Sequence, residues 1–326
     1  MKKVFFLAAA ATFALSSCVK NETVYTDAKE PIAFAAYNTI PTKAITTDKS
    51  AMDVNTEFSV FAVYEGKSEA YFPETVFVNR EGTTTWGGET PRYWPTTGTL
   101  SFAAYSPKLD NAEATYNNGT ITGIKIEGIN NATAQNDILF SNLLANKTNK
   151  DLNGNKALDI NFHHALAQVV INLIKADENP EIKIKSVTLN GVNLGGTLDI
   201  TPKTTDADSE AAWSAETTGD YEASKIADAD GETLVKGTNK TLNGVLLVPG
   251  NQTKITIVYT INNGNVTEIT HVIELAKENG VAIAPVPTWE MGKKYTYNIT
   301  FKSTEILFEP TVDNWVDVPS KDLTIE

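Results

Sequence analysis

Apolar residues recur at every second position along most of this chain, in short runs separated by turn-forming residues. The clearest runs are 158–162 and 295–301, where apolar and polar side chains alternate without a break. Successive side chains of a strand point to opposite faces of a sheet, so this period predicts strands with one buried face. Apolar-rich runs of similar length predict further strands at 58–64, 75–78, 100–105, 121–126, 168–174, 184–189, 196–200, 242–248, 254–261 and 268–275.

Asparagine, glycine and proline gather between these runs, where they favour tight turns. Such turns are predicted at 117–119, 153–155, 190–191, 249–250 and 262–265. Many short strands joined in this way are typical of antiparallel β-sandwiches, so the fold class is predicted to be all-β. The best helix candidate, 136–144, is short, and a loop is the alternative there.

The stretch 201–233 is rich in Asp, Ser, Glu and Thr. It is predicted to be a long surface loop, ordered in part by Trp213 and Tyr221. A domain boundary is expected between Phe162 and Gln168, because one predicted strand closes a sheet there and the next opens another. The two β-sandwich domains would then span 31–165 and 166–326.

The N-terminus has the pattern of a secretory signal. Lys2 and Lys3 precede an uncharged apolar run, which ends in Leu-Ser-Ser and Cys18. A membrane span would need about 20 apolar residues, and this run is shorter. A leucine three positions before a cysteine, with small residues between, resembles the end of a bacterial lipoprotein signal. Residues 1–17 are therefore predicted to be the signal peptide, Cys18 the lipidated first residue, and 18–30 a polar tether.

Cysteine and charge narrow the class of protein further. Cys18 is the one cysteine of the chain, so the exported protein has no internal disulfide. The formal charge is −13, and of 27 basic residues only Arg80 and Arg92 are arginine. Such a balance repels a phosphate backbone, so nucleic acid is not expected as a partner. With 41% apolar and 21% charged residues, the chain is expected to be globular.

The adjacent histidines His163 and His164 are a candidate metal or catalytic site. Neighbouring residues of a strand point to opposite faces, so the two rings cannot bind one ion from a regular strand. A structural position at a sheet edge is the expectation. The sequence contains no nucleophile elbow, phosphate loop or zinc motif, so no catalytic residue, metal or cofactor is predicted.

The segment 151–162 has the oxygen spacing of the first part of a calcium loop. Its sixth position is Lys156, where a glycine is expected, and its twelfth is Phe162, where a bidentate glutamate is expected. An Asn-Gly hairpin loop is therefore favoured over a calcium site.

Aromatic residues are dense between positions 86 and 105. Trp86, Trp94, Phe102 and Tyr105 could form a sugar-stacking platform, but aromatics at this density are more often the core of a sandwich. All four side chains are therefore expected to be buried.

The same region resembles a known family. The stretches 85–86, 92–95 and 100–107 read Thr-Trp, Arg-Tyr-Trp-Pro and Leu-Ser-Phe-Ala-Ala-Tyr-Ser-Pro. Together with 136–140, 161–169, 248–250 and 289–295 they resemble, in order and spacing, the fimbrillin (type V pilin) proteins of Bacteroidota. The resemblance implies two transthyretin-like sandwiches in tandem, a lipid anchor in the outer membrane, and assembly into surface fimbriae used for adhesion.

The resemblance also implies a route of assembly. A trypsin-like protease removes an N-terminal segment after a basic residue, here matched by Lys43 before Ala44, with Lys49 as a second candidate. The apolar alternation of Ile32 and Phe34 marks the edge strand that would be removed. A strand of another subunit would then pair with the exposed backbone.

A second apolar segment lies near the C-terminus. Ile306, Phe308 and Val312 make it a candidate donor strand, and the alternative is the last strand of its own domain. The expected partners are other fimbrial subunits and the outer membrane, and the adhesion ligand is not indicated. Two other classes of function remain open at this point, a surface glycan-binding lipoprotein of a nutrient-uptake system and an uptake-linked hydrolase.

Overall fold

The computed structural model describes residues 30–40, 48–53, 56–178, 180–204, 210–225, 231–262, 264–278, 281–302 and 306–314. Within these ranges the chain forms strands and no helix, so the all-β class is confirmed. The helix candidate 136–144 is a loop followed by short strands. No described segment is a helix with the length and apolarity of a membrane span.

The first lobe is built on a nine-stranded sheet, counted over the described residues. Its order is β10-β6-β3-β4-β5-β1-β11-β9, with β2 beside β1. Because β9 also pairs with β6, through Tyr105 opposite Phe140, the sheet closes on itself. Its strands are β1 (Ala33–Ile40), β2 (Asp48–Ala51), β3 (Phe58–Tyr64), β4 (Ala70–Asn79), β5 (Trp86–Gly88), β6 (Leu100–Ser106), β9 (Leu139–Ser141), β10 (Leu144–Lys147) and β11 (Leu158–His164).

A seven-stranded sheet, again counted over the described chain, extends from the first lobe into the second. Its order is β20-β19-β13-β8-β7, with β14 and β15 beside β13. Its strands are β7 (Ala112–Asn117), β8 (Thr120–Asn130), β13 (Glu181–Thr201), β14 (Glu210–Lys225), β15 (Glu232–Thr233), β19 (Lys254–Asn262) and β20 (Val266–Glu274).

A five-stranded sheet in the described part of the second lobe has the order β16-β12-β24-β25, with β17 beside β12. Its strands are β12 (Ala167–Lys175), β16 (Asn239–Thr241), β17 (Val245–Leu247), β24 (Lys293–Phe301) and β25 (Ile306–Asn314). Two-residue strands form small ladders beside it, namely β18 (Gly250–Asn251) with β23 (Thr288–Trp289) and β21 (Lys277–Glu278) with β22 (Val281–Ala282).

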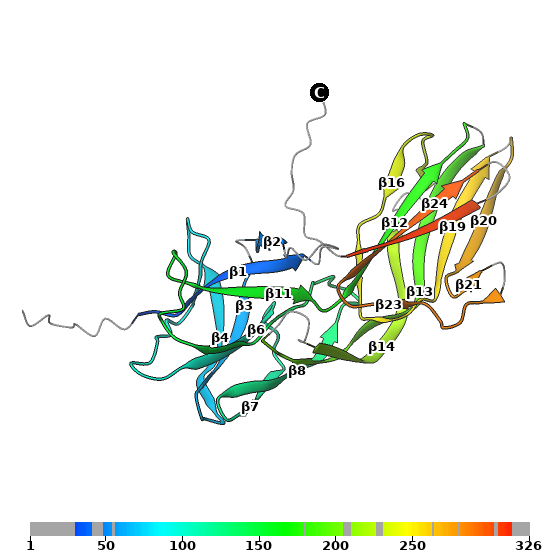
Figure 1. Cartoon of the computed structure of the whole chain (residues 1–326). Coiled ribbons are helices and arrows are strands. Elements are labelled where there is room, and N and C mark those ends of the chain that lie inside the picture. The colour runs from blue at the N-terminus through cyan, green and yellow to red at the C-terminus, as the bar shows by residue number, and fades with distance from the viewer. Residues whose placement is uncertain are drawn as a thin grey trace, which may run out of the picture.

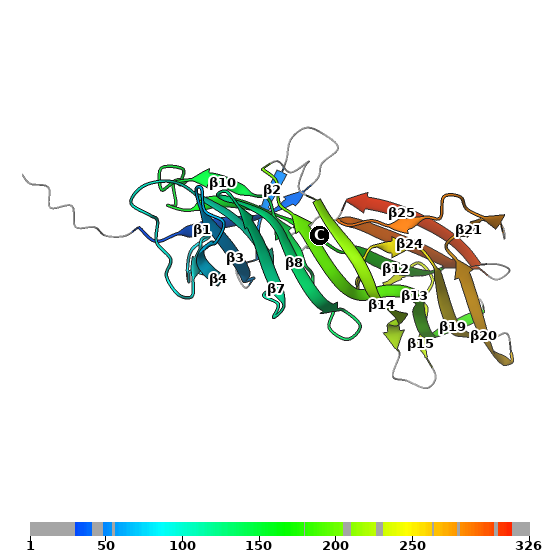
Figure 2. The ribbon, with the colours of Figure 1, turned by 90° about the horizontal axis from the view of Figure 1, so that it is seen from below.

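The two lobes share strand β13. Its first part, 181–190, pairs with β19 in the second lobe, and 195–200 pair with β8 in the first. Figure 1 shows the two lobes, and Figure 2 shows β7 and β8 in the first lobe, with β14 and β13 continuing the sheet toward the second. The division into 31–165 and 166–326 stays a prediction. The structure adds that residues after that boundary complete a sheet of the first lobe.

Three large apolar clusters form the core. One fills the inside of the closed sheet, one lies between that sheet and β8–β13, and one lies in the second lobe between β13–β19 and the five-stranded sheet. The four aromatic residues that were expected to be core, Trp86, Trp94, Phe102 and Tyr105, are 0–6% exposed, which confirms that prediction.

Two predictions about β13 and its partner are wrong. The expected turn at 190–191 is instead an irregularity within β13, where the register shifts between Leu189 and Val192 and Gly191 has a φ of 65°. The expected loop 201–233 contains the 16-residue strand β14. β14 was missed because its residues are mostly small or acidic. It is held by its backbone pairing with β13 and by Trp213 and Tyr221, which pack on the core clusters.

Candidate functional site

Strand β1 and the residue before it, Ile32, carry the side chains that the sequence assigns to a removable strand. The strand was expected at the edge of a sheet, and that expectation is wrong. β1 runs parallel to β11 from Phe34 opposite Leu158 onward, and antiparallel to β5 on its other side, where Phe34 faces Trp86. Figure 1 shows β1 in blue beside β11 in green. Because β1 lies between two strands, its removal would open a gap inside the closed sheet.

The inner face of β1 fills the centre of the first core cluster. Ile32 is 1% exposed and Phe34 is fully buried. The ring of Phe34 meets three others edge to face, with centroid distances of 6.1 Å to Phe58, 5.0 Å to Phe77 and 5.4 Å to Phe102. Edge-to-face pairs at such distances add to the free energy of burial. β1 therefore supplies a central ring of this core.

The outer face of β1 is also buried at the start of the strand, where its side chains are small. Ala33 and Ala35 form a compact cluster with Ala157. Gly87 of β5 lies opposite Ala33. A methyl group added at Gly87 would come within 2.4 Å of the Arg80 guanidinium. At its start β1 therefore carries small outer side chains, and Tyr37 packs against the same cluster further along the strand.

Backbone hydrogen bonds fix the start of β1 to the stretch 92–95. The Ile32 amide donates to the Arg92 carbonyl at 2.7 Å, and the Trp94 amide donates to the Glu30 carbonyl at 3.0 Å. The Asn149 side chain donates to the Glu30 carboxylate at 3.2 Å. The motif that carried the family resemblance thus binds the segment that precedes β1.

The far end of β1 pairs with β2. The ladder runs from Tyr37 opposite Ala51 to Ile40 opposite Asp48. Lys43 and Ala44 belong to the connection 41–47 between these two strands, which lies outside the described residues, as does Cys18. Lys49, the second cleavage candidate, has its backbone within β2 opposite Thr39. A protease needs a free extended backbone, so pairing disfavours a cut at Lys49.

The C-terminal candidate strand is β25, at one edge of the five-stranded sheet. It pairs antiparallel with β24 from Phe301 opposite Ile306 to Lys293 opposite Asn314. The side chain of Val312 is 56% exposed. The structure thus places Ile306, Phe308 and Val312 in the last strand of the second lobe, and a donor role for them stays a prediction.

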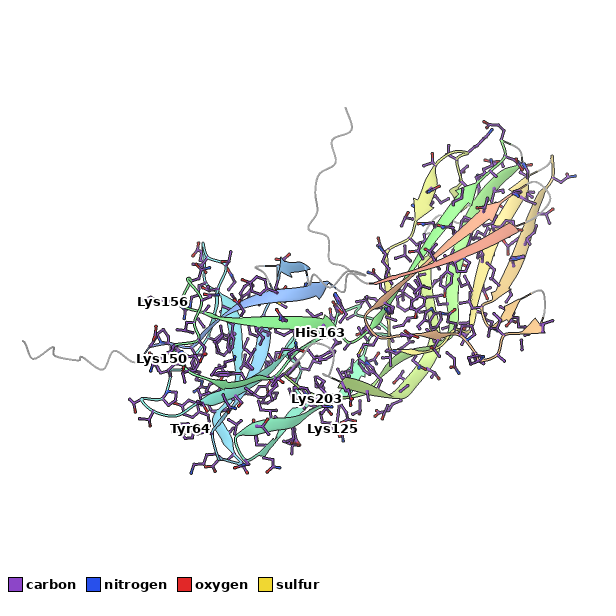
Figure 3. The ribbon with its side chains drawn as sticks, viewed as in Figure 1. Tyr64, Lys125, Lys150, Lys156, His163 and Lys203 are labelled. Atoms are coloured by element: carbon purple, nitrogen blue, oxygen red, sulfur yellow. The ribbon has the colours of Figure 1, made fainter. Side chains whose placement is uncertain are left out.

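β11 as a whole runs between β1 and β9, but its ladder with β1 ends at Phe162, so His163 and His164 pair with β9 alone. Figure 3 shows His163 near the junction of the lobes. The two rings have different partners. His163 Nε2 lies 3.0 Å from Asn142 Oδ1, and His164 Nδ1 lies 2.7 Å from Asp137 Oδ2. Both rings therefore hold loops of the first lobe against β11.

The loop that resembles part of a calcium site uses its oxygens internally. The side chain of Asn153 donates to Asp159 at 2.7 Å, and Asp151 accepts a hydrogen bond from the Thr148 amide at 2.7 Å. Figure 3 shows Lys156 on this loop and Lys150 just before it. Among the described residues there is no group of three side chains suited to hold a metal ion.

Sequence reasoning missed the outer face of β1. Ala33, Ala35 and Ala157 carry no strong signal as single residues, because alanine fits a surface as readily as a tight contact. The alternation of alanine with Ile32 and Phe34 was the available signal, since a strand buried on both faces has no polar positions.

The chain matches the profile of one protein family and resembles several solved structures. The profile of a family described as fimbrillin-like matches residues 42–315. A fimbrial protein from Bacteroides vulgatus has a TM-score of 0.59 at 16% identity, covering 87% of this chain and 99% of that one. A proposed cell adhesion protein from Bacteroides uniformis has a TM-score of 0.53 at 13% identity, with coverage of 88% and 100%. One from Parabacteroides distasonis has a TM-score of 0.50 at 11% identity, with coverage of 90% and 99%. No curated protein matches the chain.

Proposed function

This chain belongs to the fimbrillin-like family, and on that premise we propose that it is a lipid-anchored precursor of a surface fimbrial subunit that polymerises by strand exchange. A protease cuts after Lys43, the segment carrying β1 leaves, and a strand of another subunit takes its place. Family membership makes the chain a structural protein rather than an enzyme, so the hydrolase alternative is set aside.

The position of β1 is the observation that carries this proposal. β1 is paired on both sides, yet its covalent link to β2 runs through the connection that contains Lys43. Its departure would leave backbone groups of β5 and β11 unpaired beside an apolar groove, which is a template for another strand. Exposing Ile32 and Phe34 alone would cost about 3–6 kcal/mol, an upper bound. That cost favours refilling of the groove.

The sequence of β25 matches the inner side of the vacated groove, whereas its outer side chains are larger, because Leu307 and Glu309 would replace Ala33 and Ala35. Ile306 and Phe308 have the same spacing as Ile32 and Phe34, so one strand could present its isoleucine and phenylalanine where the other did. Within the described sheet β25 has a single neighbour, β24, and it therefore has fewer pairings to lose than an interior strand. A donor in this groove would run parallel to β11, as β1 does.

The order of the two processing sites has a consequence for anchoring. Cys18 precedes Lys43 in the chain, so the cut separates the lipid from the folded protein. The lipid would then hold the precursor at the outer membrane, and contacts with neighbouring subunits would hold the processed form. A copy that escapes cutting would stay attached to the membrane.

Trypsin treatment of residues 19–326, made without lipid, tests strand exchange. We expect the nicked chain to form oligomers in size-exclusion chromatography, and the Lys43→Gln, Lys49→Gln double variant to stay monomeric. A peptide of residues 30–40 should block assembly by refilling the groove, whereas the same peptide with Phe34→Asp should not. A nicked chain that keeps 44–326 folded and stays monomeric at high concentration would overturn the proposal.

A second variant tests the donor. Nicked Phe308→Asp protein should remain folded by circular dichroism but should not polymerise with itself, because an aspartate cannot fill the pocket of Phe34. Polymers of this variant that match the parent in size would show that another segment is the donor.

Labelling with a fatty acid tests the anchor. Cys18→Ala should abolish incorporation of the label, since the thiol is the attachment point. The anchor should be firm, because each buried methylene adds about 0.8 kcal/mol and two chains are joined to the thiol. Equal labelling of the variant and the parent chain would refute lipidation at Cys18.

A further inference from the structure

The second lobe contains a polar pocket away from β1. It has a volume of about 510 Å³ and opens to solvent. Its lining comes from the irregular part of β13, from β14, from the stretch 251–254 that leads into β19, from the end of β20, and from the connection before β23. The lining residues are Asn190, Gly191, Asp220, Asn251, Gln252, Thr253, Lys254, Glu274, Ala276 and Val286. This volume is within the range of small-molecule sites.

Several polar groups of this pocket are held in place by their neighbours. The Gly191 amide donates to Asp220 Oδ1 at 2.8 Å, and the Thr256 hydroxyl donates to Asn190 Oδ1 at 2.6 Å. With its oxygen engaged, Asn190 turns its amide toward Asp220. This hydrogen bond and the one from Gly191 lower the pKa of Asp220, as does the charge of Lys254. Asp220 is therefore an ionised acceptor in a fixed position.

Gln252 is likewise held in place, by hydrogen bonds of its side chain and of its backbone amide. Its Oε1 accepts a hydrogen bond from the Tyr297 hydroxyl at 3.2 Å, and its Nε2 donates to the Thr288 carbonyl at 3.2 Å. Its backbone amide donates to the Pro287 carbonyl at 2.8 Å. Groups that are fixed before binding lose little conformational entropy when a ligand arrives.

Charge and shape narrow the class of ligand. Lys254 lies opposite Glu274 in the β19–β20 ladder, so with Asp220 the pocket holds two acids and one base. In a chain of formal charge −13 this balance disfavours an anion. Acceptors beside a donor suit hydroxyl groups, which both donate and accept. Val286, 47% exposed, and Ala276 give the same pocket an apolar side.

We propose that this pocket binds a neutral pyranose unit of a glycan. The vicinal hydroxyls of the sugar bridge Asp220 and Lys254, and the C–H face of the ring lies on Val286. The proposal is independent of strand exchange, because no residue of β1, β2 or β25 lines the pocket. It gives the subunit a ligand of its own and goes beyond its role in a polymer.

Saturation-transfer NMR with methyl glycosides of glucose, galactose, mannose and N-acetylglucosamine tests the proposal on intact, uncut protein. We expect saturable transfer to at least one of them, and weaker transfer to the glycoside of glucuronic acid, which carries a carboxylate. Asp220→Asn keeps an acceptor for the Gly191 amide but loses the charge, and Lys254→Gln loses the ammonium. Each should weaken binding at least about fivefold.

Glu268→Gln is the matched control, because Glu268 lies on β20 outside the pocket and pairs with Lys185. It should bind like the parent chain. Three results would overturn the proposal: no transfer to any neutral glycoside, preferred binding of the glucuronide, or binding unchanged in both pocket variants while thermal unfolding shows them folded.

Discussion

Single residues of the first core show how a strand can be both tightly held and replaceable. Phe34 contacts the rings of Phe58, Phe77 and Phe102, so the groove keeps a shaped apolar pocket if β1 departs. The small side chains of Ala33 and Ala35 pack on the other face. A replacement strand must fill the inner pocket that Phe34 leaves, which makes a large apolar side chain at that position the selective feature.

Truncation of Phe34 measures how much of the stability of the uncut chain comes from β1. Phe34→Ala should lower the free energy of unfolding by about 3–5 kcal/mol, because it empties a pocket lined by three rings. Tyr37→Ala, on the less buried outer side, should cost clearly less. Urea titrations of both variants check this. Equal losses would contradict a central role for Phe34.

The second residue-scale prediction concerns alkaline pH. Burial, and then the hydrogen bond to Glu74 at 2.6 Å, raise the pKa of Tyr105. The unfolded chain ionises this phenol near its ordinary pKa of about 10, whereas the folded chain keeps it neutral. Its contribution to stability is therefore present below about pH 10 and is lost as pH rises toward the folded pKa.

Tyr105→Phe should flatten the fall of unfolding free energy above pH 10 by up to about 1.4 kcal/mol per pH unit, the share of one proton. Tyr93→Phe, at a position 41% exposed, is the control for loss of a tyrosine hydroxyl at the surface. Urea titrations at several alkaline pH values provide the measurement. An unchanged slope in the Tyr105 variant would count against this assignment.

At the scale of elements, alternation predicted the strands that have one buried and one open face. Runs such as 295–301 became β24, and the turn at 117–119 joins β7 to β8. β14 was not predicted, because it depends on pairing with β13 rather than on its own apolar content. The continuity of β13 through Gly191 was not predicted either, because an Asn-Gly pair favours a hairpin turn unless tertiary pairing holds both sides.

The candidate site was predictable to a similar degree. Ile32 and Phe34 follow from alternation, but the place of β1 inside a closed sheet depends on its parallel pairing with β11, which is 120 or more residues away. No local pattern encodes such a contact. The pocket around Asp220 likewise forms only when the β13 irregularity meets the β19–β20 hairpin.

Close backbone approach within the shared sheet gives a prediction at the element scale. A methyl group at Gly195 would come within 2.2 Å of the Ile129 carbonyl, so β13 and β8 must move apart to admit it. Gly195→Ala should cost about 1–3 kcal/mol. Gly154→Ala, where nothing lies within 4 Å, should be nearly neutral. The midpoint temperatures of thermal unfolding of the two variants test this prediction. Equal midpoints would contradict a requirement for glycine at position 195.

At the scale of the whole molecule, the two lobes are joined by more than a linker. Ala165 and Leu166, at the predicted boundary, are fully buried. The Trp213 indole donates to the Ala165 carbonyl at 2.7 Å, and the Gly292 amide donates to the Leu166 carbonyl at 2.9 Å. Sequence patterns favour a boundary where one strand ends and another begins, but they do not show whether that point is exposed.

The shared strand and the buried junction predict that the lobes unfold together. Unfolding of either lobe alone would break the pairing of one part of β13. It would also expose a core cluster to which both lobes contribute, with Tyr105 from the first lobe and Leu246 and Val248 from the second. Calorimetry of uncut residues 19–326 should therefore show one cooperative transition, with a calorimetric enthalpy equal to the van't Hoff value.

Limited proteolysis of the native protein should leave 163–168 intact, because cleavage requires exposed backbone. Two resolved transitions, or a first cut within 163–168, would show instead that the lobes are independent domains.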